Sequence, residues 1–156
     1  MLRQTFAATL LISAFFAILQ SANAQQASAT DNVRAIAQQY FEAWYSANGK
    51  QMEQIVHPML AKRGPIIRKE KDVELSDMSA LRLIQATEQG SGSTAPDSLV
   101  NREIHVLSVN SDIASVKIDS ELLTEYLHLI KWEGEWKIIN ILWEIKPKWR
   151  EEWNYS

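Results

Sequence analysis

The chain of 156 residues contains no cysteine, so disulfides, a lipid anchor on cysteine and a thiol nucleophile are all excluded. An apolar core alone must hold the fold. The three histidines, His57, His105 and His128, fall on separate predicted elements without the short spacings of zinc ligands, which argues against a metal. The sequence also lacks a glycine-rich phosphate loop and a Gly-x-Ser-x-Gly nucleophile motif. We therefore expect neither a metal nor a cofactor.

Positive charge is also scarce. The chain has 16 Lys and Arg against 19 Asp and Glu, a net charge of −3, and no block of basic residues. Proteins that bind nucleic acid neutralise phosphates with clustered Lys and Arg. Nucleic acid is therefore not an expected partner.

Only one long hydrophobic run is present, and it lies at the N-terminus. Arg3 precedes an apolar stretch over 5–19, and "SANA" over 21–24 ends in a small-x-small pattern. This order is typical of a secretory signal peptide, here 1–24 with cleavage after Ala24. The run is shorter than the ~20 residues that span a bilayer, so no stable membrane anchor is expected. We expect a periplasmic or secreted protein of a single domain.

Two helices are predicted after a polar linker over 25–30. The first covers 31–49, with Asp31 as a plausible N-cap and Asn48-Gly49 at its C-terminus. Its apolar side chains recur at helical spacing: Val33, Ile36, Ala37, Tyr40, Phe41, Trp44 and Tyr45. A short second helix over 50–56 stops at His57-Pro58, because proline disfavours helix at the residue before it.

The remaining elements change from helix to strand along the chain. Residues 61–70 indicate a loop or a short strand broken at Gly64-Pro65, and 76–90 a third helix with Ser76 as N-cap. Alternating patterns then predict strands over 102–110, 112–123, 124–132 and 135–145, and 147–156 is a tail. Helices followed by strands indicate an α+β fold with a mostly antiparallel sheet.

The final predicted hairpin has two apolar faces. A two-residue turn at Glu133-Gly134 places Trp132 opposite Glu135 and so sets the register. One face then carries Leu127, Leu129, Trp136, Ile138, Asn140 and Leu142. The other carries Tyr126, His128, Ile130, Ile139, Ile141 and Trp143. Helices can cover only one of these faces, so a second copy of the chain is the simplest cover for the other.

The order of these features resembles the nuclear transport factor 2-like superfamily, and within it the SnoaL-like, putative lumazine-binding group. The resemblance covers 31–146 and is most specific in "YLHLIKWEGEWKIINILWE". It implies a cone in which three N-terminal helices pack into a curved sheet around a small-molecule pocket. It also implies a homodimer through the outer sheet face, with Tyr126, His128, Ile139, Ile141 and Trp143 pointing outward.

The resemblance also bears on chemistry. Isomerases of the superfamily match "QQY", where Tyr40 would donate a hydrogen bond to an oxyanion. Their general base is an aspartate just before a proline, and here Gly64 stands at that position. Arg63 beside it cannot act as a base. Glu121, Glu125 and Glu144 are interpreted as solvated charges at strand ends.

Two functions stay open. The first is an exported binding or accessory protein, with a small planar or apolar ligand held by Tyr40, Trp44, His57, Arg63, Trp136 and Asn140. The second is a cofactor-independent enzyme of the isomerase, dehydratase or cyclase type that uses Tyr40 and His57. These residues also have purely structural interpretations. Tyr40 and Trp44 belong to an apolar helical stripe and could be core residues, and His57 could hydrogen-bond backbone carbonyls at a helix end. We favour binding without chemistry.

Overall fold

The computed structural model describes residues 3–66, 73–93 and 101–150. Its helices are α1 (Arg3–Tyr45), α2 (Gly49–Ile55), α3 (Ala80–Glu88) and the short 3-10 helix η2 (Pro147–Trp149). Its strands are β1 (Val56–Ile66), β2 (Glu74–Ser79), β3 (Arg102–Val109), β4 (Ile113–Ser120), β5 (Leu123–Trp132) and β6 (Glu135–Ile145). The predicted tail beyond Arg150 lies outside the described residues.

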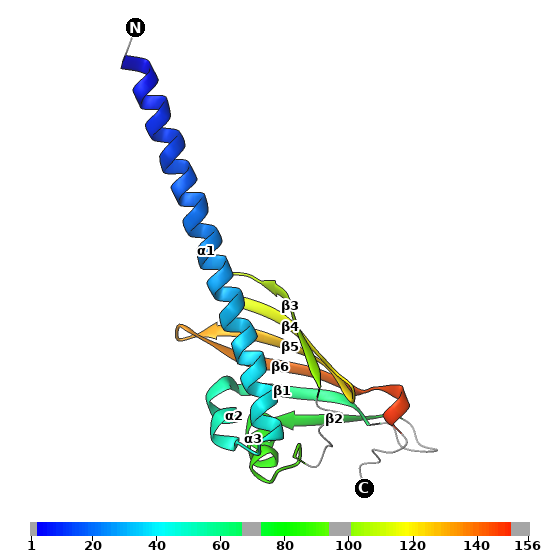
Figure 1. The fold of residues 1–156 in the computed structure, drawn as a ribbon. Helices are drawn as coiled ribbons and strands as arrows, with labels where there is room; N and C mark the ends of the chain where they lie inside the picture. Colours follow the sequence, from blue (N-terminus) through cyan, green and yellow to red (C-terminus); the bar gives the residue numbers. More distant parts are fainter. Residues whose placement is uncertain (1–2, 67–72, 94–100, 151–156) are drawn as a thin grey trace.

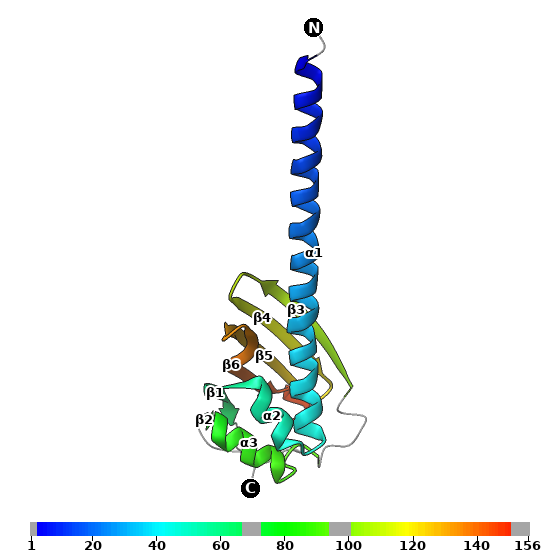
Figure 2. The same cartoon turned by 90° about the vertical axis from the view of Figure 1, so that its left-hand side faces the viewer.

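The strands form one curved sheet in the order β2-β1-β6-β5-β4-β3. Neighbouring strands are antiparallel except β1 and β6, which run parallel. Figures 1 and 2 show α1 crossing the strands on one side of the sheet, with α2 and α3 beside its C-terminal end. The apolar side chains of α1, among them Val33, Ala37 and Phe41, pack with Val116 and Leu127 from the sheet in one core. The predicted α+β architecture is confirmed.

α1 is longer than the sequence indicated, because it continues through 25–30, where a linker was predicted. Its N-terminal part projects beyond the sheet (Figure 1). Over the ranges described, no helix is both long and apolar enough to cross a membrane. At the other end, the Asn48 N–H donates to the Ala43 carbonyl oxygen at 2.9 Å and closes α1, as predicted. The Asn48 side chain also begins α2, where it accepts a hydrogen bond from the Gln51 N–H at 3.0 Å. The second helix is otherwise as predicted.

β1 and β2 were largely missed by the sequence prediction. β1 runs through Gly64-Pro65 without a break. Its pairing with β6 ends at Arg63, and a proline beyond that point removes no hydrogen bond to β6. Ser76 lies in β2, so the third helix begins later, with Ser79 as the N-cap that accepts from the Arg82 N–H.

The hairpin of β5 and β6 contains a bulge that the alternation did not reveal. Glu133 and Gly134 form the predicted turn, with φ of 52° and 86°, and Trp132 pairs with Glu135. Further along, Leu129 pairs with Ile138 but His128 pairs with Asn140, so Ile139 is an extra residue in β6. One extra residue reverses the facing of every side chain beyond it.

The predicted faces are therefore wrong beyond Ile139. Ile141 is fully buried and Trp143 is buried, whereas Leu142 is 53% exposed. Asn140 lies on the outer face, where its side-chain nitrogen is 3.2 Å from Nδ1 of His128. Tyr126 and His128 do point outward, as expected. The outer face thus loses two predicted apolar residues, Ile141 and Trp143, to the interior.

Two adjacent lysine substitutions test this register. Ile141→Lys should lower the free energy of unfolding by about 3–5 kcal/mol, because it puts an unpaired charge into the core. Leu142→Lys should change the free energy of unfolding of the monomer by no more than about 0.5 kcal/mol, because the side chain is 53% exposed in the single chain. Urea unfolding at one low protein concentration measures both variants. A larger loss for Leu142→Lys than for Ile141→Lys would show that the bulge is misplaced.

Candidate functional site

A cavity of about 250 Å³ lies where the C-terminal end of α1, the last residues of β1, and the ends of β5 and β6 meet. Its wall is mostly apolar and contains two indoles. The lining residues are Trp44, Tyr45, Lys62, Ile66, Ser76, Met78, Ala86, Ser91, Gly92, Leu122, Leu123, Trp143 and Ile145. Of these, only Lys62 carries a charge.

Two glycines let the indoles lie against the backbone. A Cβ added to Gly64 would be 2.5 Å from Cε2 of Trp143, and one added to Gly92 would be 2.5 Å from Nε1 of Trp44. Real Cβ atoms are not found so close to other atoms. Any larger residue at either position would push an indole out of place, so both glycines are part of how the cavity is built.

Lys62 belongs to a buried cluster with Tyr40 and Glu125. Nζ of Lys62 donates to the Tyr40 hydroxyl oxygen at 2.6 Å and to Oε1 of Glu125 at 2.8 Å. The Tyr40 hydroxyl donates to the same Oε1 at 2.7 Å. The three side chains come from α1, β1 and β5. One closed triangle of hydrogen bonds therefore joins three elements.

The cluster is nearly dry. Tyr40, Lys62 and Glu125 are 1%, 7% and 3% exposed. Buried charges persist in proteins only when they are paired and hydrogen-bonded, as this ammonium and carboxylate are. Nζ of Lys62 also lies 5.1 Å from the ring centre of Trp44 and 5.9 Å from that of Trp143, within the range of cation–π attraction. Burial, and then the Glu125 charge, hold the pKa of Tyr40 well above its usual value.

Comparison with known proteins identifies the family. Residues 28–144 match the family described as putative lumazine-binding, a range that contains Tyr40, Lys62, Glu125 and Trp143. The chain belongs to the putative lumazine-binding family. The family assignment made on the sequence is thereby confirmed, and the fold neighbours agree with it.

Solved structures similar to this member of the family share its fold at low identity. A nuclear transport factor 2-like protein of unknown function from Silicibacter pomeroyi is 20% identical, with a TM-score of 0.57 over 74% of this chain and 94% of that one. One from Shewanella baltica is 16% identical, with a TM-score of 0.58 over 80% and 96%. A ketosteroid isomerase-like protein from Erwinia carotovora is 14% identical, with a TM-score of 0.54 over 74% and 94%. No curated protein sequence is significantly similar to this chain.

The site residues predicted from the sequence fall into two groups, those near the cavity and those away from it. Tyr40 and Trp44 lie at the cavity, through the Lys62 cluster and the wall respectively. His57 is buried elsewhere, with its ring edge-on to Trp132 at 5.0 Å and its Nδ1 accepting from the Met59 N–H at 3.1 Å. It precedes Lys62 by five residues on β1, roughly 16 Å along an extended strand.

Arg63, Trp136 and Asn140 also lie away from the cavity wall. Arg63 is on the surface and forms an ion pair with Asp77 at 3.2 Å. Trp136 is in the core near the hairpin turn and borders a separate, open hollow with Ile36 and Ile55. The bulge moves Asn140 to the outer face.

Sequence reasoning missed Lys62 and misinterpreted Glu125. Lys62 lies in the segment predicted as a loop or a short strand, so the sequence did not define which way its side chain faces. Glu125 is buried, not solvated at a strand end as interpreted. A signal was present, because Glu125 shares the facing of Leu127 and Leu129 at a spacing of two residues. A carboxylate in line with core leucines indicates a buried partner.

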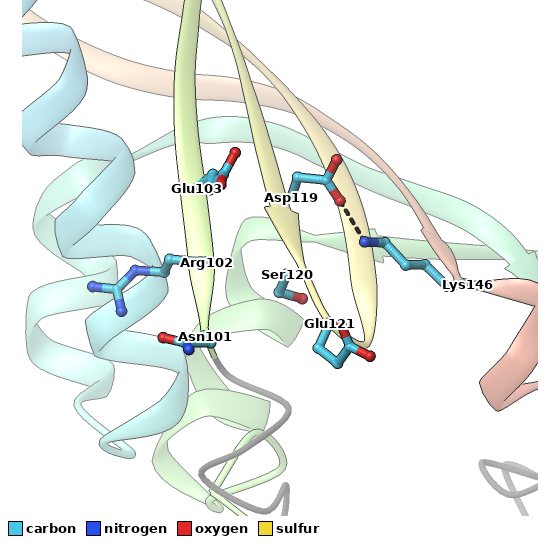
Figure 3. Close-up of a pocket in the computed structure, with 7 residues that line it drawn as sticks. All are labelled: Asn101, Arg102, Glu103, Asp119, Ser120, Glu121 and Lys146. Carbon is cyan, nitrogen blue, oxygen red and sulfur yellow. Dashed lines mark ion pairs between the residues drawn. The ribbon is translucent and has the colours of Figure 1, made fainter.

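A larger hollow of about 410 Å³ lies where β3 begins and β4 ends (Figure 3). It is lined by charged groups that are already paired. Asp119 contacts Lys117 at 2.5 Å and Lys146 at 2.6 Å, and hydrogen bonds from these lysines lower the pKa of Asp119 to about 2. Glu121 pairs with Lys148. Within the described residues no group of three or more His, Asp or Glu could hold a metal. These ion pairs join strand ends and leave the apolar cavity as the candidate site.

Proposed function

We propose that the protein binds a small planar molecule in the cavity beside Lys62 and acts as a binding or accessory protein. One observation carries the proposal: a buried ammonium lies 5.1 Å from the ring centre of Trp44 and 5.9 Å from that of Trp143, in a described wall that is otherwise uncharged and mostly apolar. Ligand sites combine such apolar and aromatic surfaces with a few polar groups that orient the ligand. The family match supports the same reading.

The size of the cavity restricts the ligand. Pockets for drug-sized molecules measure roughly 300–1,000 Å³, and this one measures about 250 Å³. A molecule of one or two fused rings is therefore the class that the cavity suits. Indole walls stack well on flat rings, which favours an aromatic ligand over a branched aliphatic one.

The enzyme alternative has less support. In isomerases of this superfamily an aspartate is the base, and the resemblance puts that aspartate at Gly64. Trp143 presses on the Gly64 backbone, so no carboxylate side chain fits there. Tyr40 and His57, the residues assigned to the chemistry, are apart: Tyr40 on α1 contacts Lys62, whereas His57 lies five residues before Lys62 on β1 and contacts Trp132. The observation that favours an enzyme is the Tyr40–Lys62–Glu125 cluster, which could move a proton at a bound ligand.

A ligand panel with a charge-neutral double variant tests the proposal. Pterins, flavins and two-ring aromatic compounds should include ligands that change the fluorescence of Trp44 and Trp143. Lys62→Met with Glu125→Gln should weaken their binding about tenfold or more, because the charged donor among the described wall residues is gone. Removing both charges together avoids leaving one buried charge unpaired.

Lys131→Met is the matched control, because Lys131 is exposed on β5 and should leave binding unchanged. Calorimetry gives the affinities. If no compound of the panel binds, or if the double variant binds as the native chain does, the proposal is wrong. Conversion of any compound would favour the enzyme alternative.

We also propose that the protein is exported, because the first 24 residues have the pattern of a signal peptide. Expression in a Gram-negative host should yield a periplasmic form that begins at Gln25. Intact mass of the purified protein measures the terminus. A periplasmic form that retains Leu2 would contradict cleavage.

Finally, we propose that a second copy covers the outer sheet face. With Ile141 and Trp143 buried, the apolar centre of that face is the cross-strand pair of Tyr126 and Leu142, 42% and 53% exposed. Leu142→Lys with Tyr126→Lys should shift the chain from dimer to monomer in sedimentation, because two charges would then oppose their copies. An unchanged assembly state would contradict a dimer through this face.

A further inference from the structure

The ammonium of Lys62 has one donor left over. A lysine ammonium carries three N–H groups. One is directed to the Tyr40 hydroxyl and one to Oε1 of Glu125. No third oxygen or nitrogen acceptor for Nζ occurs among the described residues. Nζ also lies over the rings of Tyr40, Trp44 and Trp143, which attract a cation but accept no strong hydrogen bond.

This donor belongs to the residue that reaches the cavity. Lys62 lines the cavity wall, whereas Tyr40 and Glu125 do not. A molecule between the two indoles would therefore meet the ammonium first. Because buried donors in proteins are almost always satisfied, the ligand is expected to supply the missing acceptor.

The net charge of the Tyr40–Lys62–Glu125 cluster determines whether a ligand can offer a charged or a neutral acceptor to Lys62. Lys62 contributes one positive charge, Glu125 one negative charge, and Tyr40 none, since its raised pKa keeps the phenol protonated at neutral pH. The ammonium is thus already neutralised at 2.8 Å. An anionic ligand would add an uncompensated negative charge to a dry site close to the Glu125 carboxylate, which is strongly unfavourable. A neutral carbonyl oxygen would accept the hydrogen bond without that penalty.

We infer that the cavity selects uncharged planar molecules that present a ring carbonyl, such as a lactam or imide, to Lys62, and rejects the corresponding carboxylates. This inference rests on the proposed binding function and adds the ligand's chemical class to it. Glu125 is then a specificity-determining residue, because its charge cancels the one that would otherwise attract anions.

Three two-ring probes of similar size separate the possibilities. Carbostyril is neutral and has a ring carbonyl, quinaldate carries a carboxylate, and quinoline has neither. Calorimetry on the full-length protein at neutral pH should find carbostyril bound about tenfold or more tightly than either of the others. Lys131→Met should bind all three as the native chain does, because Lys131 lies on the exposed part of β5.

Glu125→Gln changes the charge and keeps the shape. Its amide oxygen can still accept from Tyr40 and Lys62, but the ammonium is now unpaired. The variant should bind quinaldate about tenfold or more tightly than the native chain does and prefer it to carbostyril. Where this variant fails to fold, Lys62→Met with Glu125→Gln serves instead. That double variant lacks the cation of Lys62, and carbostyril should lose its advantage over quinoline.

The results test the inference about ligand class separately from the proposed binding function. If the native chain prefers quinaldate, or binds carbostyril no better than quinoline, the inference is wrong while binding in the cavity stands. If none of the probes binds, and none of the wider panel binds, both are wrong. If the double variant still binds carbostyril more tightly than quinoline, another group donates the hydrogen bond to the carbonyl. That result would overturn the role of Lys62.

Discussion

The ion pair between Lys62 and Glu125 is the interaction on which the site depends. It joins β1 to β5 across the intervening β6, and the hydroxyl of Tyr40 adds α1 to the same cluster. Removing one partner alone would leave a buried charge that a protein interior stabilises poorly, at a loss of about 3–5 kcal/mol. The pair therefore ties the helix layer to the sheet and holds one donor in a fixed place beside the cavity.

The bulge at Ile139 is the second requirement. Without an extra residue in β6, Trp143 would face away from the helices, as simple alternation predicts. With it, the indole lies over Gly64 on β1 and close to the ammonium. One irregularity in strand pairing thus supplies both an aromatic wall of the cavity and a second ring for the cation. Bulges often redirect side chains in this way near functional sites.

Glycine at position 64 links the geometry of the cavity to its chemistry. The residue has no side chain because the ring and backbone of Trp143 occupy that space. The same contact leaves no room for a carboxylate side chain at this position. The described wall of the cavity is consequently mostly apolar and aromatic, and the charged residue in it, Lys62, is paired with Glu125.

Local patterns in the sequence determined much of this protein. The helical spacing from Val33 to Tyr45, the turn at Glu133-Gly134 and the order of the elements predicted an α+β fold of the correct family, because these signals depend only on neighbours in the chain. What only the tertiary structure decided is which side chains meet. The bulge is set by pairing between β5 and β6, and the partnership of Lys62 with Glu125 joins residues 63 positions apart. No periodicity records such contacts, since they arise from the packing of strands that are distant in sequence. The residues of the site could therefore be identified only from the packing of the sheet against α1.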